Sequence, residues 1–508
     1  MPDCNAELFH FPSFDRRKIE ASFTGGDVSS DGGVMVLRAA DRRLGLVRAF
    51  DAVIADPRDP DLVTHAQLDL LRQRIYGIAL GYEDLNDHDT LRRDLAWQSA
   101  VERDGELASS PTLCRLENRA DRQTAVAMSR VLVEQFIASF KAAPAELILD
   151  FDATDDRVHG LQEGRAFHGY YGDWCFLPLY VFCGEQLLVS YLRPSNIDAA
   201  RHAHAILKLL VTRLRQAWPG VQIIFRGDSG FCRWKMLRWC ERHGVDYIVG
   251  LAKNACLLAL ARESMQSAAA QFESTQQKQR HFGWLDYAAG SWDRARRVIA
   301  KAEHSAQGAN PRFIVTSLAG DAQALYDEVY CARGEMENRI KEQQLGLFAD
   351  RTSCHGWWAN QFRLLLSSAA YVLMETIRRV GLCGTELARA QVTTLRLKVL
   401  KIGTVILRNC PRRGPAVGAP RFGVALPRWA VAPHPAALFE RLPLSGTLRL
   451  NAAPAQFSVK RGRCCPRHAK NNGGKGHCLP SAPKPPRESS NRTRPLDFCA
   501  NTLAADER

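Results

Sequence analysis

Apolar residues recur every three or four positions over most of the first 140 residues, which is the spacing of amphipathic helices. The segments with this pattern are 31–46, 65–82, 110–119 and 122–140. Arginines at positions 115, 119 and 122 fall near one helical face. The pattern fits an ordinary helical domain with a solvated basic face, and it also fits a helical DNA-binding module.

The pattern changes after residue 145, where short runs of apolar residues alternate with turn residues. It predicts three strands followed by a helix, a strand, a helix and a final strand. In that order the segments are 146–154, 177–184, 185–193, 200–218, 221–228, 234–243 and 246–252. This order is typical of a mixed α/β fold.

Three further strands are predicted between residues 256 and 325, and helices resume after them. The organisation predicted is a helical amino-terminal domain (1–140), the first part of an α/β core (145–255), a β-rich insertion (256–325), the completion of the core (326–405) and a tail (411–508). The tail is basic, rich in proline and without apolar periodicity, so we expect it to be disordered.

Composition adds limits on the class of protein. The chain has 508 residues, of which 46% are apolar and 24% charged, as in globular proteins with about two to four domains. A net charge of +14 favours a polyanionic partner, although much of it lies in the tail. We expect no membrane span and no secretion, because no long apolar run or signal-peptide pattern occurs. Cysteines without a Cys-x-x-Cys pair favour a reduced, cytoplasmic protein.

Aspartates stand at unusual positions in two predicted strands. Asp150 and Asp152 share one face of the strand that contains them, and carboxylates on a mostly apolar face are costly unless they are paired or bind a cation. Asp228 follows the apolar run of a later strand, at the end where open α/β sheets carry their sites. Each aspartate taken alone also fits a turn or a helix cap.

A third acidic position lies on a predicted helix. Glu337 is four residues from Arg333 and four from Lys341, so the three side chains share one face. Taken alone, they fit an exposed ladder of ion pairs. Together with two aspartates at strand ends, the glutamate completes a set of oxygen ligands of the kind that divalent cations such as Mg²⁺ or Mn²⁺ prefer.

Several motifs resemble those of bacterial insertion-sequence transposases of the Asp-Asp-Glu (DDE) class, in the cut-and-paste branch that carries a β-rich insertion before the glutamate. The motifs are DFDATDD, RGDSGFC, YCARGEMENRIKEQQ, SSDGGVMVLRAADRRLGL and GIALGYEDLNDHD, together with ADRTSCHGWWANQFRLLLSSAAYVL. They occur in the family's order from residue 15 to about 405. The resemblance implies a ribonuclease H-like mixed sheet as the catalytic core and an amino-terminal DNA-binding domain.

The resemblance also implies a mechanism. Asp152, Asp228 and Glu337 match the family's three catalytic carboxylates, which would bind two Mg²⁺ or Mn²⁺ ions. With these ions the enzyme would cut DNA at the ends of an insertion sequence and join the 3′ ends to target DNA. The implied partners are double-stranded DNA, with its terminal inverted repeats and target sites, and a second copy of the chain in a homodimer on DNA.

Further positions match the family's DNA contacts. Tyr330 and Arg333 match its tyrosine and arginine. The family places a lysine seven residues after the glutamate, where this chain has Gln344, so Lys341 is the expected substitute one turn earlier. These residues would hold phosphates without reading the base sequence.

Other functions fit part of the pattern. A transposase-derived DNA-binding protein without catalysis would keep the fold but would not cut DNA, and a metal-dependent nuclease on the same fold would cut but not join. A glycosidase with paired carboxylates is disfavoured by the arginine-rich helix around Glu337. Trp284 and Trp292 fit stacking on an extruded base, but packing within their own sheet is the stronger interpretation.

Overall fold

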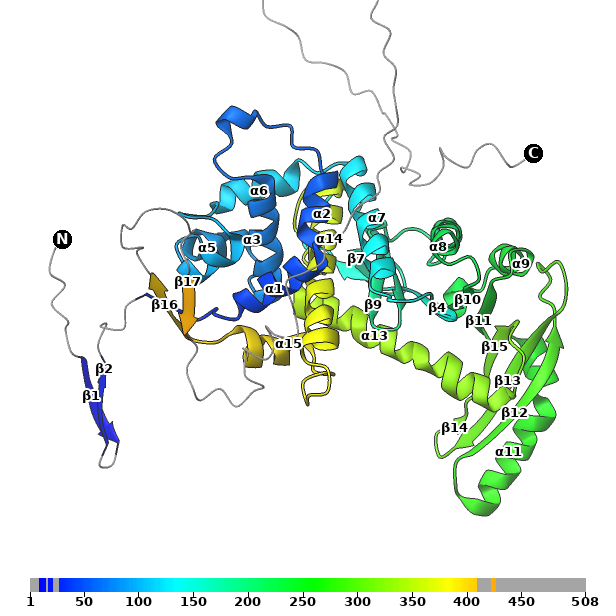
Figure 1. The fold of residues 1–508 in the computed structure, drawn as a ribbon. Coiled ribbons are helices and arrows are strands. Elements are labelled where there is room, and N and C mark those ends of the chain that lie inside the picture. Colours follow the sequence, from blue (N-terminus) through cyan, green and yellow to red (C-terminus); the bar gives the residue numbers. More distant parts are fainter. Residues whose placement is uncertain (1–8, 15–16, 22–26, 409–421, 426–508) are drawn as a thin grey trace, which may run out of the picture. The chain divides into compact units, whose positions relative to one another are not determined.

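The computed structural model describes residues 9–14, 17–21, 27–408 and 422–425 (Figure 1). The tail predicted to be disordered therefore lies outside the described residues, except for one short strand. Among the described residues, no helix is both long and apolar enough to cross a membrane.

A nine-stranded mixed sheet forms the centre of the described fold. Across the sheet its strands are β12 (Gln279–Tyr287), β13 (Arg296–Ser305), β15 (Arg312–Thr316), β11 (Asp246–Leu251), β10 (Gln222–Gly227), β4 (Glu146–Ala153), β8 (Leu179–Cys183) and β9 (Gln186–Tyr191), with β14 (Gly308–Ala309) paired to β13. Strands β4, β10 and β11 run parallel, and the outer pairs are antiparallel. The predicted mixed α/β class is confirmed.

The alternation predicted for β4 is also present. Leu147, Leu149 and Phe151 are buried on one face, as expected for a central strand that is covered on both sides. The helices α8 (Ala203–Ala217) and α9 (Trp234–Arg242) follow β9 and β10, close to their predicted positions. The apolar pattern therefore predicts the order of the longer strands and helices from residue 146 to residue 251.

The strands between residues 279 and 316 extend the central sheet instead of forming a sheet of their own. β15 pairs with β11 in antiparallel register, Val249 opposite Val315, and β13 and β12 continue outward. Without β15, β11 would be an edge strand with unpaired backbone groups, and such edges are usually covered. Helix α11 (Arg262–Thr275) packs against β12 and β13 (Figure 1).

A second difference lies between β4 and β8, which the apolar pattern predicts to be consecutive. The structure places a small three-stranded sheet there, with β7 (Asp173–Phe176) between β5 (Asp156–Arg157) and β6 (Ala166–His168). These strands are too short for apolar periodicity to reveal them.

Helices of the amino-terminal half surround one long helix from the carboxyl-terminal half. They are α1 (Val34–Leu44), α2 (Leu46–Val53), α3 (Gln67–Leu80), α4 (His88–Leu91), α5 (Leu95–Val101), α6 (Ser110–Asn118) and α7 (Arg122–Ala138). Helix α14 (Trp357–Thr376) packs against α3, α7 and β9 (Figure 1). Nearly all of α14 is buried, so it joins the helices and the sheet in one apolar core.

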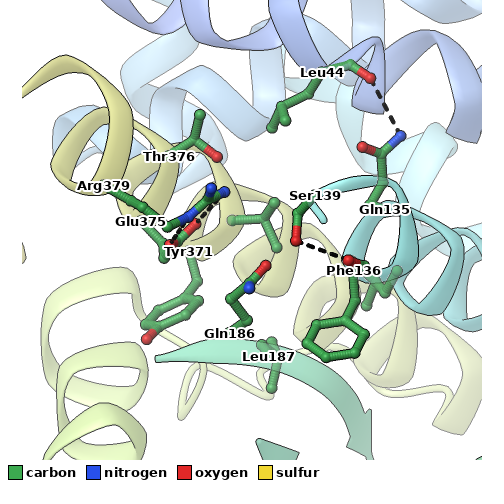
Figure 2. A pocket seen from close by; sticks show the side chains of 12 residues that line it. Leu44, Gln135, Phe136, Ser139, Gln186, Leu187, Tyr371, Glu375, Thr376 and Arg379 are labelled. Atoms are coloured by element: carbon green, nitrogen blue, oxygen red, sulfur yellow. Dashed lines mark hydrogen bonds and ion pairs between the residues drawn. The ribbon is translucent and has the colours of Figure 1, made fainter. Parts of the chain in front are cut away.

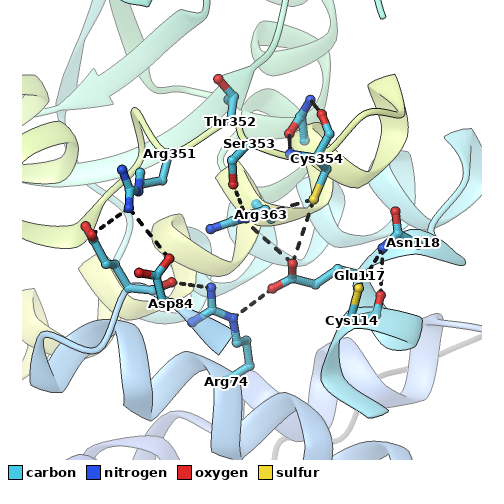
Figure 3. Close-up of polar contacts among 12 residues, drawn as sticks. Arg74, Asp84, Cys114, Glu117, Asn118, Arg351, Thr352, Ser353, Cys354 and Arg363 are labelled. Carbon is cyan, nitrogen blue, oxygen red and sulfur yellow. Dashed lines mark hydrogen bonds and ion pairs between the residues drawn. The ribbon is translucent and has the colours of Figure 1, made fainter. Parts of the chain in front are cut away.

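A buried polar network reinforces this connection (Figure 3). Glu117 on α6 accepts a hydrogen bond from Arg74 on α3 at 2.7 Å, and Arg363 on α14 lies 3.9 Å from its other oxygen. The carboxylate is 1% exposed, so the two arginines supply the charge that its burial requires.

The first described residues form strands, although the sequence predicts a mostly helical amino-terminal region. β1 (Phe9–Phe14) pairs with β2 (Arg17–Ala21), and β3 (Val28–Ser29) pairs with β16 (Thr404–Arg408), which also pairs with β17 (Phe422–Ala425). Pro12 lacks the backbone N–H that a helix interior needs, which agrees with the strand.

Candidate catalytic site at the ends of two parallel strands

Asp152 and Asp228 lie side by side at the carboxyl ends of β4 and β10. The last registered pair of these parallel strands is Phe151 with Gly227, and each aspartate is the next residue along its strand. Burial is the main reason that the pKa of Asp152 is raised to about 6, and the nearby negative charges of Asp228 and Glu337 add to it. The sheet therefore concentrates negative charge at this edge.

Asp150 has a different role from Asp152, although both share one face of β4. Arg226 lies on β10 in register with Asp150. Its guanidinium binds the Asp150 carboxylate through two nitrogens, one of them at 2.7 Å. Arg226 also donates to the backbone carbonyl of Val329. Asp150 is thus held in a buried ion pair with Arg226, whereas Asp152 is paired with Arg333.

The helix that carries Glu337 reaches the same place. Residues 325–346 form one irregular helical run, with π-helical turns at 325–330 and 342–346 on either side of α13 (Gly334–Lys341). Helix α13 contacts β4 (Figure 1). π-Helical turns interrupt regular helices most often at functional sites.

Arg333 joins two of the three carboxylates. Its Nη1 donates to Asp152 Oδ2 at 2.9 Å, and its Nη2 donates to Glu337 Oε1 at 2.5 Å. The side chain of Asp152 is 15% exposed and that of Glu337 is 45% exposed. A single guanidinium thus pairs with both Asp152 and Glu337, and with Asp228 nearby the site has an excess of negative charge.

The three carboxylates do not meet the spacing of a metal site. In the described part of the chain, no group of three or more histidine, cysteine, aspartate or glutamate side chains is spaced to hold a metal ion. Here the nitrogens of Arg333 bind both Asp152 Oδ2 and Glu337 Oε1. The structure brings the three predicted carboxylates to one edge of the sheet, with Arg333 as the shared partner of Asp152 and Glu337.

Tyr330 lines a cavity of about 290 Å³ next to Asp228. The cavity also has Ser229, Lys253 and Arg312 in its wall, so both positive charge and hydroxyl groups face it. Burial raises the pKa of Tyr330, and the charge of Asp228 contributes.

Sequence reasoning missed Gly250, which makes room for this arrangement. A side chain there would place its Cβ 2.6 Å from Tyr330 Oη and 2.8 Å from the backbone nitrogen of Ser229. A glycine inside the apolar run DYIVGLA is a signal of close backbone approach, and it could have been used.

Gln344 replaces the lysine that the resemblance places at this position. Its Nε2 donates a 2.9 Å hydrogen bond to the backbone carbonyl of Asp155, so it supports the chain just after β4. Lys341 is exposed at the last position of α13.

The two tryptophans of the insertion lie against arginines in and beside its sheet. Arg297 covers the ring of Trp284 at 3.8 Å, and Arg296 lies 5.3 Å from the ring of Trp292.

A second cavity, between α7, α14 and β9, has a volume of only about 20 Å³ and holds the ion pair of Glu375 with Arg379 (Figure 2). A cavity of this volume can hold about one water molecule.

The cryo-EM structure of the piggyBac transposase synaptic complex with hairpin DNA is similar over 72% of this chain and 79% of that chain, with 11% sequence identity and a TM-score of 0.39. At that level the similarity carries no argument about fold or function. No curated protein matches the sequence.

The sequence itself matches one family over most of its length. The match is to "Transposase DDE domain group 1" and spans residues 11–414. The chain therefore belongs to this family of DDE transposases and is a DNA-cutting and DNA-joining enzyme.

Proposed function

We propose that this transposase cuts DNA at the ends of an insertion sequence and joins the freed 3′ ends to target DNA, with Asp152, Asp228 and Glu337 as catalytic residues. The observation that carries the proposal is the meeting of all three carboxylates at one sheet edge, from segments far apart in the sequence. The order β9-β8-β4-β10-β11, with α8 and α9 between strands, supports a ribonuclease H-like core.

The carboxylates suit divalent cations in their chemistry and charge. Oxygen donors are the ligands that Mg²⁺ and Mn²⁺ prefer, and the single positive charge of Arg333 does not balance three carboxylates. Asp152, Asp228 and Glu337 would hold two such ions once Arg333 moves aside. The ions would activate the attacking oxygen and stabilise the leaving oxygen.

Other side chains position the DNA. Tyr330, Arg333 and Lys341 lie on the helical run that carries Glu337, and they would contact phosphates. Lys253 and Arg312 add positive charge around the neighbouring cavity. We further propose that the amino-terminal helices, residues 1–140, bind the terminal inverted repeats, and that two copies of the chain assemble on the DNA.

The amino-terminal arginines differ in how they are engaged. Arg119 donates to Asp56 at 3.1 Å and to Gln67 at 2.5 Å, so it is committed to the fold. Arg115 is exposed and contacts Thr112, so it is the better candidate for a phosphate contact.

The test is cleavage and strand transfer by the full chain on linear DNA that carries the element's own ends, with and without Mg²⁺. Asp228→Asn and Glu337→Gln should each reduce cleavage by several orders of magnitude, because each removes a ligand charge while preserving shape. DNA binding, measured by fluorescence anisotropy, should persist.

Asp104→Asn is the matched control, because Asp104 is an exposed aspartate. This variant should cut DNA normally. Normal cleavage by Asp228→Asn would remove that residue from the site. Metal-dependent cutting without any joining would favour a nuclease, and binding without cutting in the wild-type chain would favour the inactive alternative.

A further inference from the structure

The small sheet between β4 and β8 exposes aromatic rings to an unusual degree. Its β6–β7 hairpin exposes 54% of Phe167, 86% of Tyr170 and 45% of Trp174. Tyr171 stands beside Tyr170 at the turn, where Gly172 adopts a positive φ of 69°. We call these four side chains the aromatic hairpin. Large exposed aromatic groups that gather in one place usually mark a binding surface.

The rings are arranged in pairs, with a positive charge above one of them. Phe167 and Trp174 lie opposite each other across the hairpin, with ring centroids 6.2 Å apart in an edge-to-face geometry. The guanidinium of Arg165 lies 4.5 Å from the Trp174 ring. Aromatic rings with a neighbouring arginine are the combination by which proteins stack on nucleic-acid bases and neutralise the adjoining phosphates.

The aromatic hairpin adjoins the candidate catalytic site. The chain leaves β4 just after Asp152, forms this small sheet, and returns as β8, where Tyr180 pairs with Asp152. Burial chiefly raises the pKa of Tyr171 to about 12, and the charges of Asp155 and Asp152 add to this rise. Tyr171 is therefore within electrostatic reach of the carboxylate that is proposed to act on DNA.

We propose that the aromatic hairpin binds unpaired bases next to the phosphodiester that is cut, by stacking on Tyr170 and Trp174. This inference rests on the proposed function, which places DNA at Asp152. The bases must be unpaired or at a frayed end, because inside a duplex their faces are covered by neighbouring bases.

The experiment compares two DNA probes bound by the full chain in EDTA, so that no cutting occurs. One is a blunt fluorescein-labelled duplex, and the other is the same duplex with a short overhang of thymidines. Trp174→Leu and Tyr170→Ala should weaken anisotropy-detected binding to the overhang probe about tenfold, as the loss of one stacked base does. Binding to the blunt probe should change less than about twofold.

Matched variants separate stacking from other causes. Trp174→Phe keeps an aromatic ring and should retain binding, whereas Trp174→Leu keeps only apolar volume. Leu209→Ala removes an exposed apolar side chain on α8 and should have no effect. Tyr170 is so exposed that its removal leaves the fold intact, which protects the test against misfolding.

Equal losses on both probes, or no loss on either, would overturn the proposal. A change of oligomeric state in sedimentation, with overhang binding unaltered, would instead identify the hairpin as a contact between copies of the chain.

Asp228→Asn serves to separate the proposed catalytic function from the stacking proposal. If it cuts DNA normally, the catalytic role proposed for Asp228 fails while the binding result stands. If it is inactive and Trp174→Leu binds normally, only the stacking proposal fails.

Discussion

At the residue scale, Asp150 and Asp152 show what the alternation of side chains along a strand can predict and what it cannot. The sequence places both on one face of β4, but it cannot tell which one has a partner. Arg226 occupies the neighbouring strand in register with Asp150, and this register is a property of the folded sheet. The pairing of Arg333 with both Asp152 and Glu337 also depends on the meeting of distant segments.

A pH-dependent stability follows from the raised pKa of Asp152. Its pKa is about 6 in the folded chain against a usual value of 3.8, so the folded state binds the proton more tightly than the unfolded state. The contribution of this group to stability is full below about pH 4 and is lost as the pH rises through 6. Asp152→Asn should therefore stabilise the metal-free protein by roughly 1–3 kcal/mol at pH 8 and by almost nothing at pH 4.

Urea unfolding in EDTA at pH 4, 6 and 8 measures this difference. Asp104→Asn again serves as the control, and its stability should follow that of the wild-type chain at each pH. A stabilisation by Asp152→Asn that is equal at all three values would contradict the electrostatic origin.

At the element scale, the order of strands and helices from residue 146 to residue 251 could be predicted, but the small sheet could not. Long buried strands have a clear apolar pattern, whereas β5, β6 and β7 are two to four residues long and are held by their pairing. The extension of the sheet by β15 also depends on pairing between segments far apart in sequence. Such pairings leave no local periodicity.

Gly250 provides a prediction at this scale. In Gly250→Ala the new Cβ would meet Tyr330 Oη at 2.6 Å and the backbone nitrogen of Ser229 at 2.8 Å, so the strand end that carries Asp228 has to shift. A displacement of about 1 Å in a catalytic group lowers rates by about a hundredfold, and we expect a loss of that size in cleavage.

Initial cleavage rates and the thermal unfolding midpoint should be measured together. Gly283→Ala on β12 is the matched control, because an added Cβ there meets nothing within 4 Å. Normal cleavage by Gly250→Ala would show that the strand end tolerates the extra atom.

At the scale of the whole molecule, the structure ties the amino-terminal helices to α14 and to the sheet through a shared core. The apolar spacing of α3, α7 and α14 could be predicted, but their packing partners could not, because an amphipathic face does not specify what covers it. The sequence offers no sign that Glu117 would lie between Arg74 and Arg363.

Breaking this network should destabilise the whole molecule. Glu117→Gln leaves two buried arginines without their counter-charge, and we expect a loss of about 3–5 kcal/mol in the free energy of unfolding. Glu106→Gln removes the partner of Arg92 in an exposed pair and should cost less than about 1 kcal/mol. Chemical denaturation of both variants decides the matter, and equal losses would contradict the role of burial.

The position of Arg333 has a consequence for how this transposase responds to its ligands. A divalent cation would bind the carboxylates of these ion pairs, and a DNA phosphate would bind the guanidinium of Arg333. Each ligand would thus replace one partner of the same ion pairs. Whatever draws Arg333 towards DNA would then raise the affinity for the cation, and by thermodynamic reciprocity the cation would raise the affinity for DNA by the same factor. An enzyme built this way would hold its metal weakly while searching and tightly once an end is bound.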